Sequence, residues 1–324
     1  MAYAFVGFGL MLLVIGSAAV LRGGVELSRN IGLPPLLIGL LVVSIGTATP
    51  ELVVALQAAS RQAPDLALGT IIGSNIINIL LILGLGALIR PIPASPKTVL
   101  RDGGALLLSS IALLALVEAG RIPRDCGFVL LGGFAVYVLV CFLTDWRRPT
   151  PDSSAEARVL SRRDRALTPA ASTILLLFGL ACLYFGGGYV VDGGLAVARY
   201  YHMPEAVIGL TLVAVGSSLP ELVTTVTASI RGQSSPAAGN LIGSNVVNVL
   251  LALGLTASIR PLTVSAHVAG ADVYVMAAAA VVVPLLLASR WRLTRGQGFF
   301  LVVAYLAYLG FVAWRQGVVP GSFF

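Results

Sequence analysis

The sequence predicts an all-α integral membrane protein in which ten transmembrane helices form two inverted five-helix repeats. Two observations predict this fold: apolar stretches poor in charge recur along the whole chain, and residues 34–91 resemble residues 204–261. Of the 324 residues, 57% are hydrophobic and only 11% are charged. Soluble domains usually carry about 25% charged residues, so most of this chain is not expected to face water.

The apolar stretches are long enough to cross a membrane, because a helix of about 20 residues spans a hydrocarbon core of about 30 Å. The first stretch has no basic residue before it, unlike a secretory signal, and we interpret it as a retained span. The ten predicted spans are residues 5–21, 34–59, 68–89, 103–118, 127–144, 170–191, 205–230, 239–259, 269–289 and 298–314.

The basic residues predict the orientation of the chain. With ten spans and an outer N-terminus, fifteen of the 21 Lys and Arg residues fall in inner loops and six in outer loops. The positive-inside rule then places both termini outside a bacterial inner (plasma) membrane. This distribution also explains the net charge of +7 without a nucleic acid. The lipid bilayer is the expected surrounding partner, and nothing in the sequence indicates an obligate protein partner.

The internal repeat predicts how the spans are arranged. Residues 34–91 align with residues 204–261 without a gap, and 28 of the 58 positions are identical. Because five spans separate the copies, the second copy must enter the membrane in the opposite sense. Inverted repeats are common in secondary transporters, whose ion sites lie near the midplane. A duplication without alternating access remains the alternative interpretation.

The same repeat predicts the division of the chain. Residues 1–144 form the first repeat and residues 170–324 form the second. Residues 145–169 form a polar cytoplasmic linker with six arginines. This linker is too short for a folded domain, so we expect no large cytosolic regulatory module.

Two acidic residues, Glu51 and Glu221, lie deep in apolar spans that contain no lysine or arginine. A charge at this depth costs about 3 kcal/mol or more, so each is expected to face a cation or a proton. A protonated glutamic acid in a structural hydrogen bond is the alternative. Pro50 and Pro220 precede them and should break or kink each helix, because proline lacks an N–H and clashes with the preceding turn.

Hydroxyl and amide side chains accompany these carboxylates at matching places in both repeats. Residues four apart share a helix face, which groups Ser74 with Asn78 and Ser244 with Asn248. Asn75 and Asn245 point elsewhere and are expected to make contacts between helices. The candidate metal ligands with polar side chains are Glu51, Glu221, Asn78, Asn248, Thr47, Ser74, Ser217, Ser218 and Ser244.

All of these ligands bind through oxygen, which hard cations such as Ca²⁺ prefer. The sequence contains no histidine or cysteine cluster of the kind that holds zinc or copper. Two carboxylates balance one divalent cation, or two or more monovalent cations in overlapping sites. A divalent ion and several monovalent ions would therefore compete for the same carboxylates, and this competition is the physical basis for exchanging one ion for the other.

The motifs GTATPE (46–51), GSNIIN (73–78), GSSLPE (216–221) and GSNVVN (243–248) resemble the two α-repeats of the sodium/calcium exchanger family, within the calcium/cation antiporter superfamily. The resemblance is greatest to its compact prokaryotic members and covers the whole chain. It implies a ten-helix fold in which the first and sixth spans slide across the other eight.

The resemblance also implies four cation sites in a diamond. Glu51 and Glu221 would be the principal Ca²⁺ ligands, shared with Na⁺, and the two asparagines of the ligand set would line the middle site. The resemblance assigns Thr47 and Ser74 to the inner sodium site, Ser217, Ser218 and Ser244 to the outer one, and backbone carbonyls to Ser44 and Ala214. The ions are transported, so no cofactor is expected.

Three departures from the family pattern affect this interpretation. Asn248 stands where some members carry aspartate, which argues against potassium dependence. Ala48 replaces a serine, and this puts the inner sodium site in doubt. Thr49 replaces an apolar residue, and the sequence offers no reason for it. Asp102 and Asp272, which also lie 170 residues apart, are expected to cap helix starts.

The sequence thus predicts a secondary antiporter that exchanges Ca²⁺ for Na⁺ by alternating access. A Ca²⁺/H⁺ antiporter is the closest alternative, because a glutamate can be discharged by a proton as well as by sodium. A cation channel belongs to a different class and would not need inverted repeats. An enzyme is not expected, because the sequence has no nucleophile–base pair and no HExxH motif.

Overall fold

The computed structural model describes most of the chain as apolar helices. The described residues are 2–31, 43–146, 167–232, 234–265 and 270–315. Within them, eight helices are long and apolar enough to cross a membrane, and a bent pair, Glu205–Ser217 with Leu219–Ile230, makes up to nine. The predicted span 34–59 corresponds to α3 (Ser44–Ser60), and its first part lies outside the described residues. The chain is therefore a multi-pass membrane protein.

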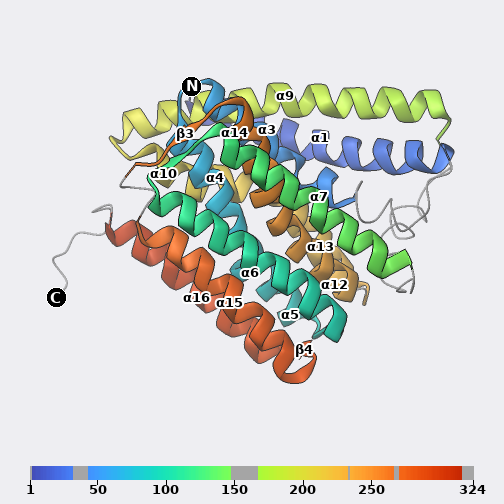
Figure 1. Cartoon of the computed structure of the whole chain (residues 1–324). Coiled ribbons are helices and arrows are strands. Elements are labelled where there is room, and N and C mark those ends of the chain that lie inside the picture. The colour runs from blue at the N-terminus through green and yellow to red at the C-terminus, as the bar shows by residue number, and fades with distance from the viewer. Residues whose placement is uncertain (1, 32–42, 147–166, 233, 266–269, 316–324) are drawn as a thin grey trace.

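The two halves contain corresponding elements (Figure 1). The first half consists of α1 (Ala2–Asn30), α3, α4 (Pro64–Ile76), η2 (Ile77–Ile82), α5 (Leu83–Ile89), β1 (Ile92–Pro93), α6 (Pro96–Glu118), β2 (Arg121–Ile122) and α7 (Arg124–Trp146). The second consists of α9 (Pro169–Tyr200), α10 (Glu205–Ile208), η3 (Gly209–Val213), α11 (Ala214–Ser217), α12 (Leu219–Ile230), α13 (Ser234–Val247), η4 (Asn248–Leu253), α14 (Gly254–Ile259), β3 (Leu262–Thr263), α15 (Ala271–Arg290), β4 (Arg292–Leu293) and α16 (Arg295–Arg315). Most of the predicted linker, residues 147–166, lies outside the described residues.

Helices α1 and α9 lie side by side along one edge of the molecule (Figure 1). Glycines line their contact, and a Cβ atom added to Gly9 would lie 2.8 Å from the carbonyl oxygen of Gly186. Likewise, a Cβ atom on Gly179 would lie 2.8 Å from the carbonyl oxygen of Gly16. Glycine therefore lets the two backbones touch, as small residues do between membrane helices.

Both of these helices extend well beyond the predicted spans, which ended at residues 21 and 191. Ion pairs occur beyond both predicted ends. Arg29 binds Glu26 within α1 at 3.3 Å, and Asp192 of α9 binds Arg61 at 2.6 Å. The Gln57 side chain also donates to the Tyr184 carbonyl, so the end of α3 is attached to α9 at two points.

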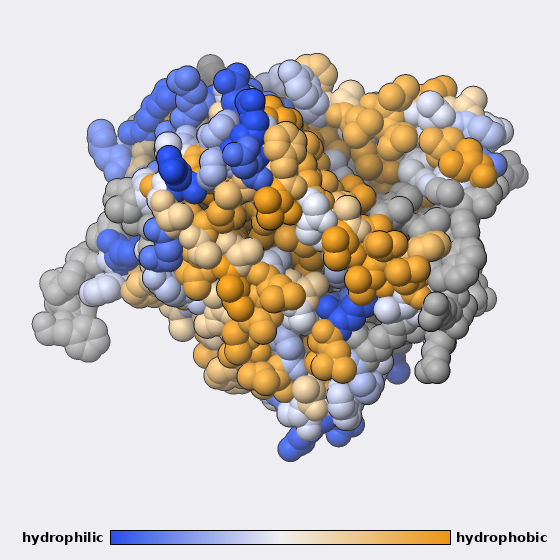
Figure 2. Space-filling view, in the orientation of Figure 1, coloured by the Kyte–Doolittle hydropathy of each residue, from blue (hydrophilic) through white to orange (hydrophobic). Residues whose placement is uncertain are grey.

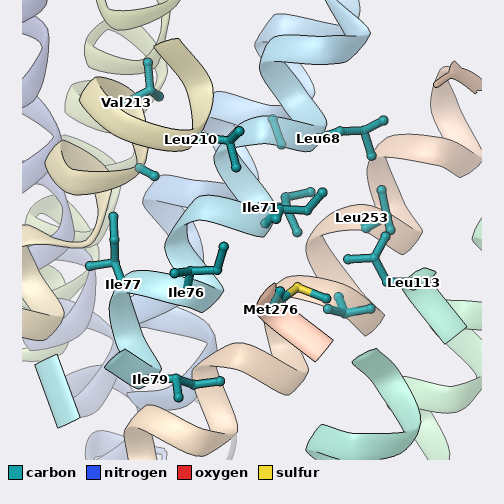
Figure 3. Packing of buried hydrophobic residues seen from close by; sticks show 14 of the residues in the cluster. Leu68, Ile71, Ile76, Ile77, Ile79, Leu113, Leu210, Val213, Leu253 and Met276 are labelled. Atoms are coloured by element: carbon teal, nitrogen blue, oxygen red, sulfur yellow. The ribbon is translucent and has the colours of Figure 1, made fainter. Parts of the chain in front are cut away.

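The centre of the molecule consists of two spans, residues 64–89 and 239–259. In these two spans, 83% of the most apolar stretch is buried, against 17–39% in the other candidate spans. Ile71, Ile76 and Ile77 from the first central span and Leu253 from the second belong to one buried cluster, and Figure 3 shows Ile71 on the side toward Leu253. Apolar side chains cover much of the outer face in Figure 2, as expected of a surface that meets lipid.

Two short antiparallel strand pairs connect the halves at their loops. Ile92 of β1 pairs with Leu293 of β4, and Ile122 of β2 pairs with Leu262 of β3. Since Ile92 and Leu262 occupy equivalent places in the aligned segments, each half makes the same connection to the other.

The structure contradicts the prediction that Asp102 and Asp272 cap helix starts. The Asp272 carboxylate accepts from Arg315 at 2.7 Å and from the Tyr308 hydroxyl at 3.0 Å, both on α16. Asp102 lies beyond the first turn of α6 and binds Arg101 at 2.7 Å and Tyr137 at 3.3 Å. Both carboxylates are buried and bind neighbouring side chains instead of the free N–H groups of a helix end.

We expect Asp272→Asn to lower the thermal stability of the purified protein. Removing one partner of a buried ion pair costs about 3–5 kcal/mol, and partial exposure of the Arg315 side chain should reduce this cost. Thermal unfolding in detergent measures the effect. Asp125→Asn is the matched control, because Asp125 also lies in the first turn of a helix but is exposed. Equal melting temperatures would contradict a stabilising role for Asp272.

Candidate cation site

Seven elements bring the predicted ligands to the interior, and one of them is α11, which ends at Ser217. Glu51 lies on α3, Ser74 on α4 and Asn78 on η2, while Glu221, Ser244 and Asn248 hold the equivalent places on α12, α13 and η4. All nine predicted side-chain ligands are at most 1% exposed. They are Thr47, Glu51, Ser74, Asn78, Ser217, Ser218, Glu221, Ser244 and Asn248.

The side chain of Glu51 reaches the motif of the other half that contains Glu221. Glu51 Oε1 accepts a hydrogen bond from Ser218 Oγ at 2.9 Å. Among the described residues, Glu51 Oε2 and both carboxylate oxygens of Glu221 have no hydrogen-bond partner. A buried carboxylate without compensating bonds is very costly, so this pair has the character of a cation site.

Hydroxyl pairs join the two halves beside the carboxylates. Thr47 Oγ1 and Ser244 Oγ share a hydrogen bond of 3.1 Å, and Ser74 Oγ and Ser217 Oγ share one of 3.3 Å. Each pair joins the first motif of one half to the second motif of the other. The structure thus brings together hydroxyls that are 143 or 197 residues apart in the sequence.

The asparagines also pair across the halves. Asn78 Nδ2 donates to Asn245 Oδ1 at 3.2 Å, and Asn248 Nδ2 donates to Asn75 Oδ1 at 3.1 Å. The amide oxygens of Asn78 and Asn248 accept no hydrogen bond from the described part of the chain. The prediction that Asn75 and Asn245 make contacts between helices is confirmed.

The predicted break beside the glutamates is present in one half only. In the second half the chain bends by 46° between α11 and α12, and Pro220 lies in the first turn of α12. In the first half α3 continues without interruption through Pro50. Thr49 Oγ1 donates to the Ile45 carbonyl at 2.7 Å, one turn back along α3. The carbonyl that loses its donor at Pro50 is that of Gly46, so this bond does not explain why α3 continues, and the threonine at this position has no structural explanation.

The two remaining predicted ligands are backbone carbonyls. The Ala214 carbonyl accepts from Ser218 N at 3.1 Å and from Ser217 Oγ at 3.3 Å. A carbonyl oxygen has two acceptor sites, and both are occupied here. Ser44 is the first residue of α3, and its side chain lies outside the described set.

The site contains π-helical turns that sequence reasoning missed. Asn78 lies in η2, Asn248 begins η4, and η3 precedes Ala214. A π-turn adds a residue to the helical repeat and is frequent at functional sites. The motifs GSNIIN and GSNVVN carry no glycine or proline signal that distinguishes this turn from an ordinary α-helix.

Comparison with known proteins agrees with this geometry. The sequence profile of the family described as "Sodium/calcium exchanger protein" matches residues 1–143 and 171–314. The chain belongs to the sodium/calcium exchanger family. The predicted resemblance to this family is therefore confirmed.

Relatives of this exchanger match it over nearly their whole length. It is 31% identical to the sodium/calcium exchanger MaX1 of Methanosarcina acetivorans, over 93% of this chain and 95% of that protein. It is 34% identical to the inner membrane protein YrbG of Escherichia coli, over 98% and 99%. A solved structure of the sodium-calcium exchanger NCX_Mj superposes with a TM-score of 0.65 at 28% identity, covering 95% of this chain and 97% of that one.

Family membership establishes the general activity of this exchanger. It is a calcium/cation antiporter, and because the family consists of transporters it is not an enzyme. Ions are the substrates of such a protein. The buried carboxylate pair and its amide and hydroxyl neighbours offer the oxygen ligands that these ions require.

Proposed function

We propose that the protein exchanges Ca²⁺ for Na⁺ by alternating access, with calcium moving outward and sodium inward. The observation that carries this proposal is the buried pair Glu51 and Glu221, which retains three carboxylate oxygens without a hydrogen-bond partner among the described residues. Two carboxylates neutralise one Ca²⁺, or two or more Na⁺ in overlapping positions. An empty pair would leave uncompensated charge in the interior, so ions should enter and leave by replacement.

We further propose which groups serve each ion. Glu51 and Glu221 would bind Ca²⁺ together with the amide oxygens of Asn78 and Asn248. The hydroxyls of Thr47 and Ser74 would belong to the inner sodium site, and those of Ser217, Ser218 and Ser244 to the outer one. The backbone carbonyls of Ser44 and Ala214 complete the proposed set, and the Ala214 carbonyl would have to release the hydrogen bond from Ser217 Oγ when it binds an ion.

The architecture that we propose for this cycle is ten transmembrane helices in two inverted repeats, residues 1–144 and 170–324, with a cytoplasmic linker at 145–169. The glycine-lined pair α1 and α9 would slide across the remaining helices. The excess of basic residues in one set of loops supports termini outside a bacterial inner membrane. The relative YrbG, named an inner membrane protein, agrees with this location.

Sodium is the proposed coupling ion for two reasons. Asn78 and Asn248 are amides, so the site has no further titratable group beyond its two glutamates. The relatives MaX1 and NCX_Mj are both named sodium/calcium exchangers. Neither observation favours the proton-coupled alternative.

The test is radiolabelled calcium uptake into proteoliposomes that contain the purified protein. An outward sodium gradient and, separately, an outward proton gradient are imposed on the same preparation. We expect the sodium gradient alone to drive uptake. Uptake driven by protons alone would contradict sodium coupling, and a calcium leak that ignores both gradients would indicate a channel.

We expect Asn248→Asp to change the pH and cation dependence of transport without abolishing it. The substitution adds a third titratable group beside the two glutamates. At low pH its protonation cancels the added charge and transport should resemble that of the wild type, whereas the difference should grow as the pH rises. Initial uptake rates over a pH series, with Na⁺ or K⁺ as counter-ion, measure this effect. An unaltered profile would argue against Asn248 as a site residue.

A further inference from the structure

Two buried asparagines outside the proposed ligand set, Asn75 and Asn245, contact the two asparagines inside it. Resting on the proposed exchange function, we propose that Asn75 and Asn245 are positioning residues that turn the amide oxygens of Asn248 and Asn78 toward the transported cation. Both are fully buried. Each is attached to the other half of the molecule and not to its own helix.

The orientation of Asn75 follows from a backbone group. Asn75 Nδ2 lies 3.4 Å from the carbonyl oxygen of Asn245 and 3.7 Å from the Met276 sulfur. A carbonyl can only accept, so the amide nitrogen of Asn75 must face it. Asn75 Oδ1 then faces the opposite way and accepts from Asn248 Nδ2 at 3.1 Å.

The orientation of Asn75 determines that of Asn248. Because Asn248 Nδ2 donates to Asn75, Asn248 Oδ1 points away from Asn75, and it has no hydrogen-bond partner among the described residues. An asparagine amide presents either an acceptor or two donors, depending on how it is flipped. A donor would repel a cation, so the flip state of Asn248 decides whether it can act as a ligand.

The other half repeats this arrangement with one difference. Asn245 Oδ1 accepts from Asn78 Nδ2 at 3.2 Å, and Asn78 Oδ1 is likewise left without a partner in the described ranges. Asn245 Nδ2, however, makes no hydrogen bond to any described group. Both the nitrogen and the oxygen of the Asn75 amide therefore make hydrogen bonds to described groups, whereas only the oxygen of the Asn245 amide does. Asn75 should consequently restrict the orientation of Asn248 more strongly than Asn245 restricts that of Asn78.

A double-mutant cycle on Asn75 and Asn248 tests the proposal. The variants are Asn75→Leu, Asn248→Leu and the double variant, all measured by sodium-driven calcium uptake over a calcium concentration series. We expect Asn75→Leu to raise the calcium concentration for half-maximal uptake by about tenfold, as loss of an outer-shell partner does at metal sites. In the Asn248→Leu background, Asn75→Leu should add little, because residues that act through one another are not additive.

The matched control is Thr70→Val on the same helix as Asn75. Thr70 is fully buried, but its hydroxyl donates to the Leu66 carbonyl within α4. We expect this variant to bind calcium like the wild type. If Asn75→Leu does not fold, the same cycle on Asn245 and Asn78 decides the proposal.

Independent, additive effects of the two substitutions would overturn the positioning role, as would a wild-type calcium dependence in a folded Asn75→Leu protein. Failure of the underlying exchange function would look different. In that case the wild-type protein itself would show no sodium-driven uptake, before any variant is compared.

Discussion

Replacing either Glu51 or Glu221 with glutamine is expected to abolish calcium transport while leaving a folded, inserted protein. Each substitution removes one of two negative charges that face a divalent cation in a buried site. Losing one partner of a buried charge pair costs about 2–5 kcal/mol, and each 1.4 kcal/mol corresponds to about tenfold in affinity. We therefore expect the initial uptake rate at low calcium to fall by about thirtyfold to a few thousandfold.

Folding should survive these substitutions because glutamine has nearly the same shape as glutamate. In Glu51→Gln the amide oxygen can still accept the hydrogen bond from Ser218 Oγ. The matched control is Glu118→Gln, at the exposed end of α6, where Glu118 accepts from the Tyr274 hydroxyl. Transport near the wild-type rate in either site variant, with the control unchanged, would refute the assignment of these carboxylates.

The second large effect is expected at the contact between α1 and α9. A Cβ atom on Gly9 would lie 2.8 Å from both the Gly186 carbonyl oxygen and the Val190 nitrogen, which are backbone atoms and cannot rotate away. The helices would have to separate, and overpacking of this kind costs about 1–3 kcal/mol. We expect Gly9→Ala to lower the melting temperature and to slow calcium transport.

Gly7→Ala provides a control on the same helix. A Cβ atom on Gly7 would have nothing within 4 Å, and alanine favours a helix over glycine in both positions. Thermal unfolding and calcium uptake are measured on both variants. If Gly9→Ala were as stable and as active as Gly7→Ala, close backbone contact between the two helices would not matter for either property.

The sequence predicted the site better than it predicted the helices around it. Glu51 and Glu221 stand out because an unpaired acid in an apolar span is expensive, and the 170-residue repeat connects each to its hydroxyl and amide neighbours. Both features can be recognised without knowing which helices pack together. The side chains found in this way come from seven elements and form one buried cluster in the structure.

Features that depend on a neighbouring helix could not be predicted in this way. The first and sixth spans are predicted to end at residues 21 and 191, before Arg22 and Asp192, yet α1 continues to Asn30 and α9 to Tyr200. The contact between the two helices continues past these points, since a Cβ atom on Gly23 would lie 2.9 Å from the Ser172 carbonyl oxygen and one on Gly193 would lie 3.0 Å from the Ala2 carbonyl oxygen. The role of Asp272 depends on Arg315, which lies 43 residues away on another helix.

The two prolines differ in their effect on the helix. Pro50 and Pro220 occupy equivalent positions, and a break or kink is expected from the sequence at both. Only Pro220 coincides with a break. The residues before the two prolines differ, with Ala48 and Thr49 in the first half and Ser218 and Leu219 in the second, so the proline alone does not determine the local backbone.

The most direct test of the central claim is equilibrium binding of radiolabelled calcium to the purified protein, with Na⁺ or K⁺ added at equal ionic strength. If one set of buried carboxylates serves both ions, Na⁺ should displace calcium, K⁺ should not, and Glu221→Gln should bind almost none. Calcium binding that ignores sodium, or that persists in Glu221→Gln, would contradict a shared site at Glu51 and Glu221.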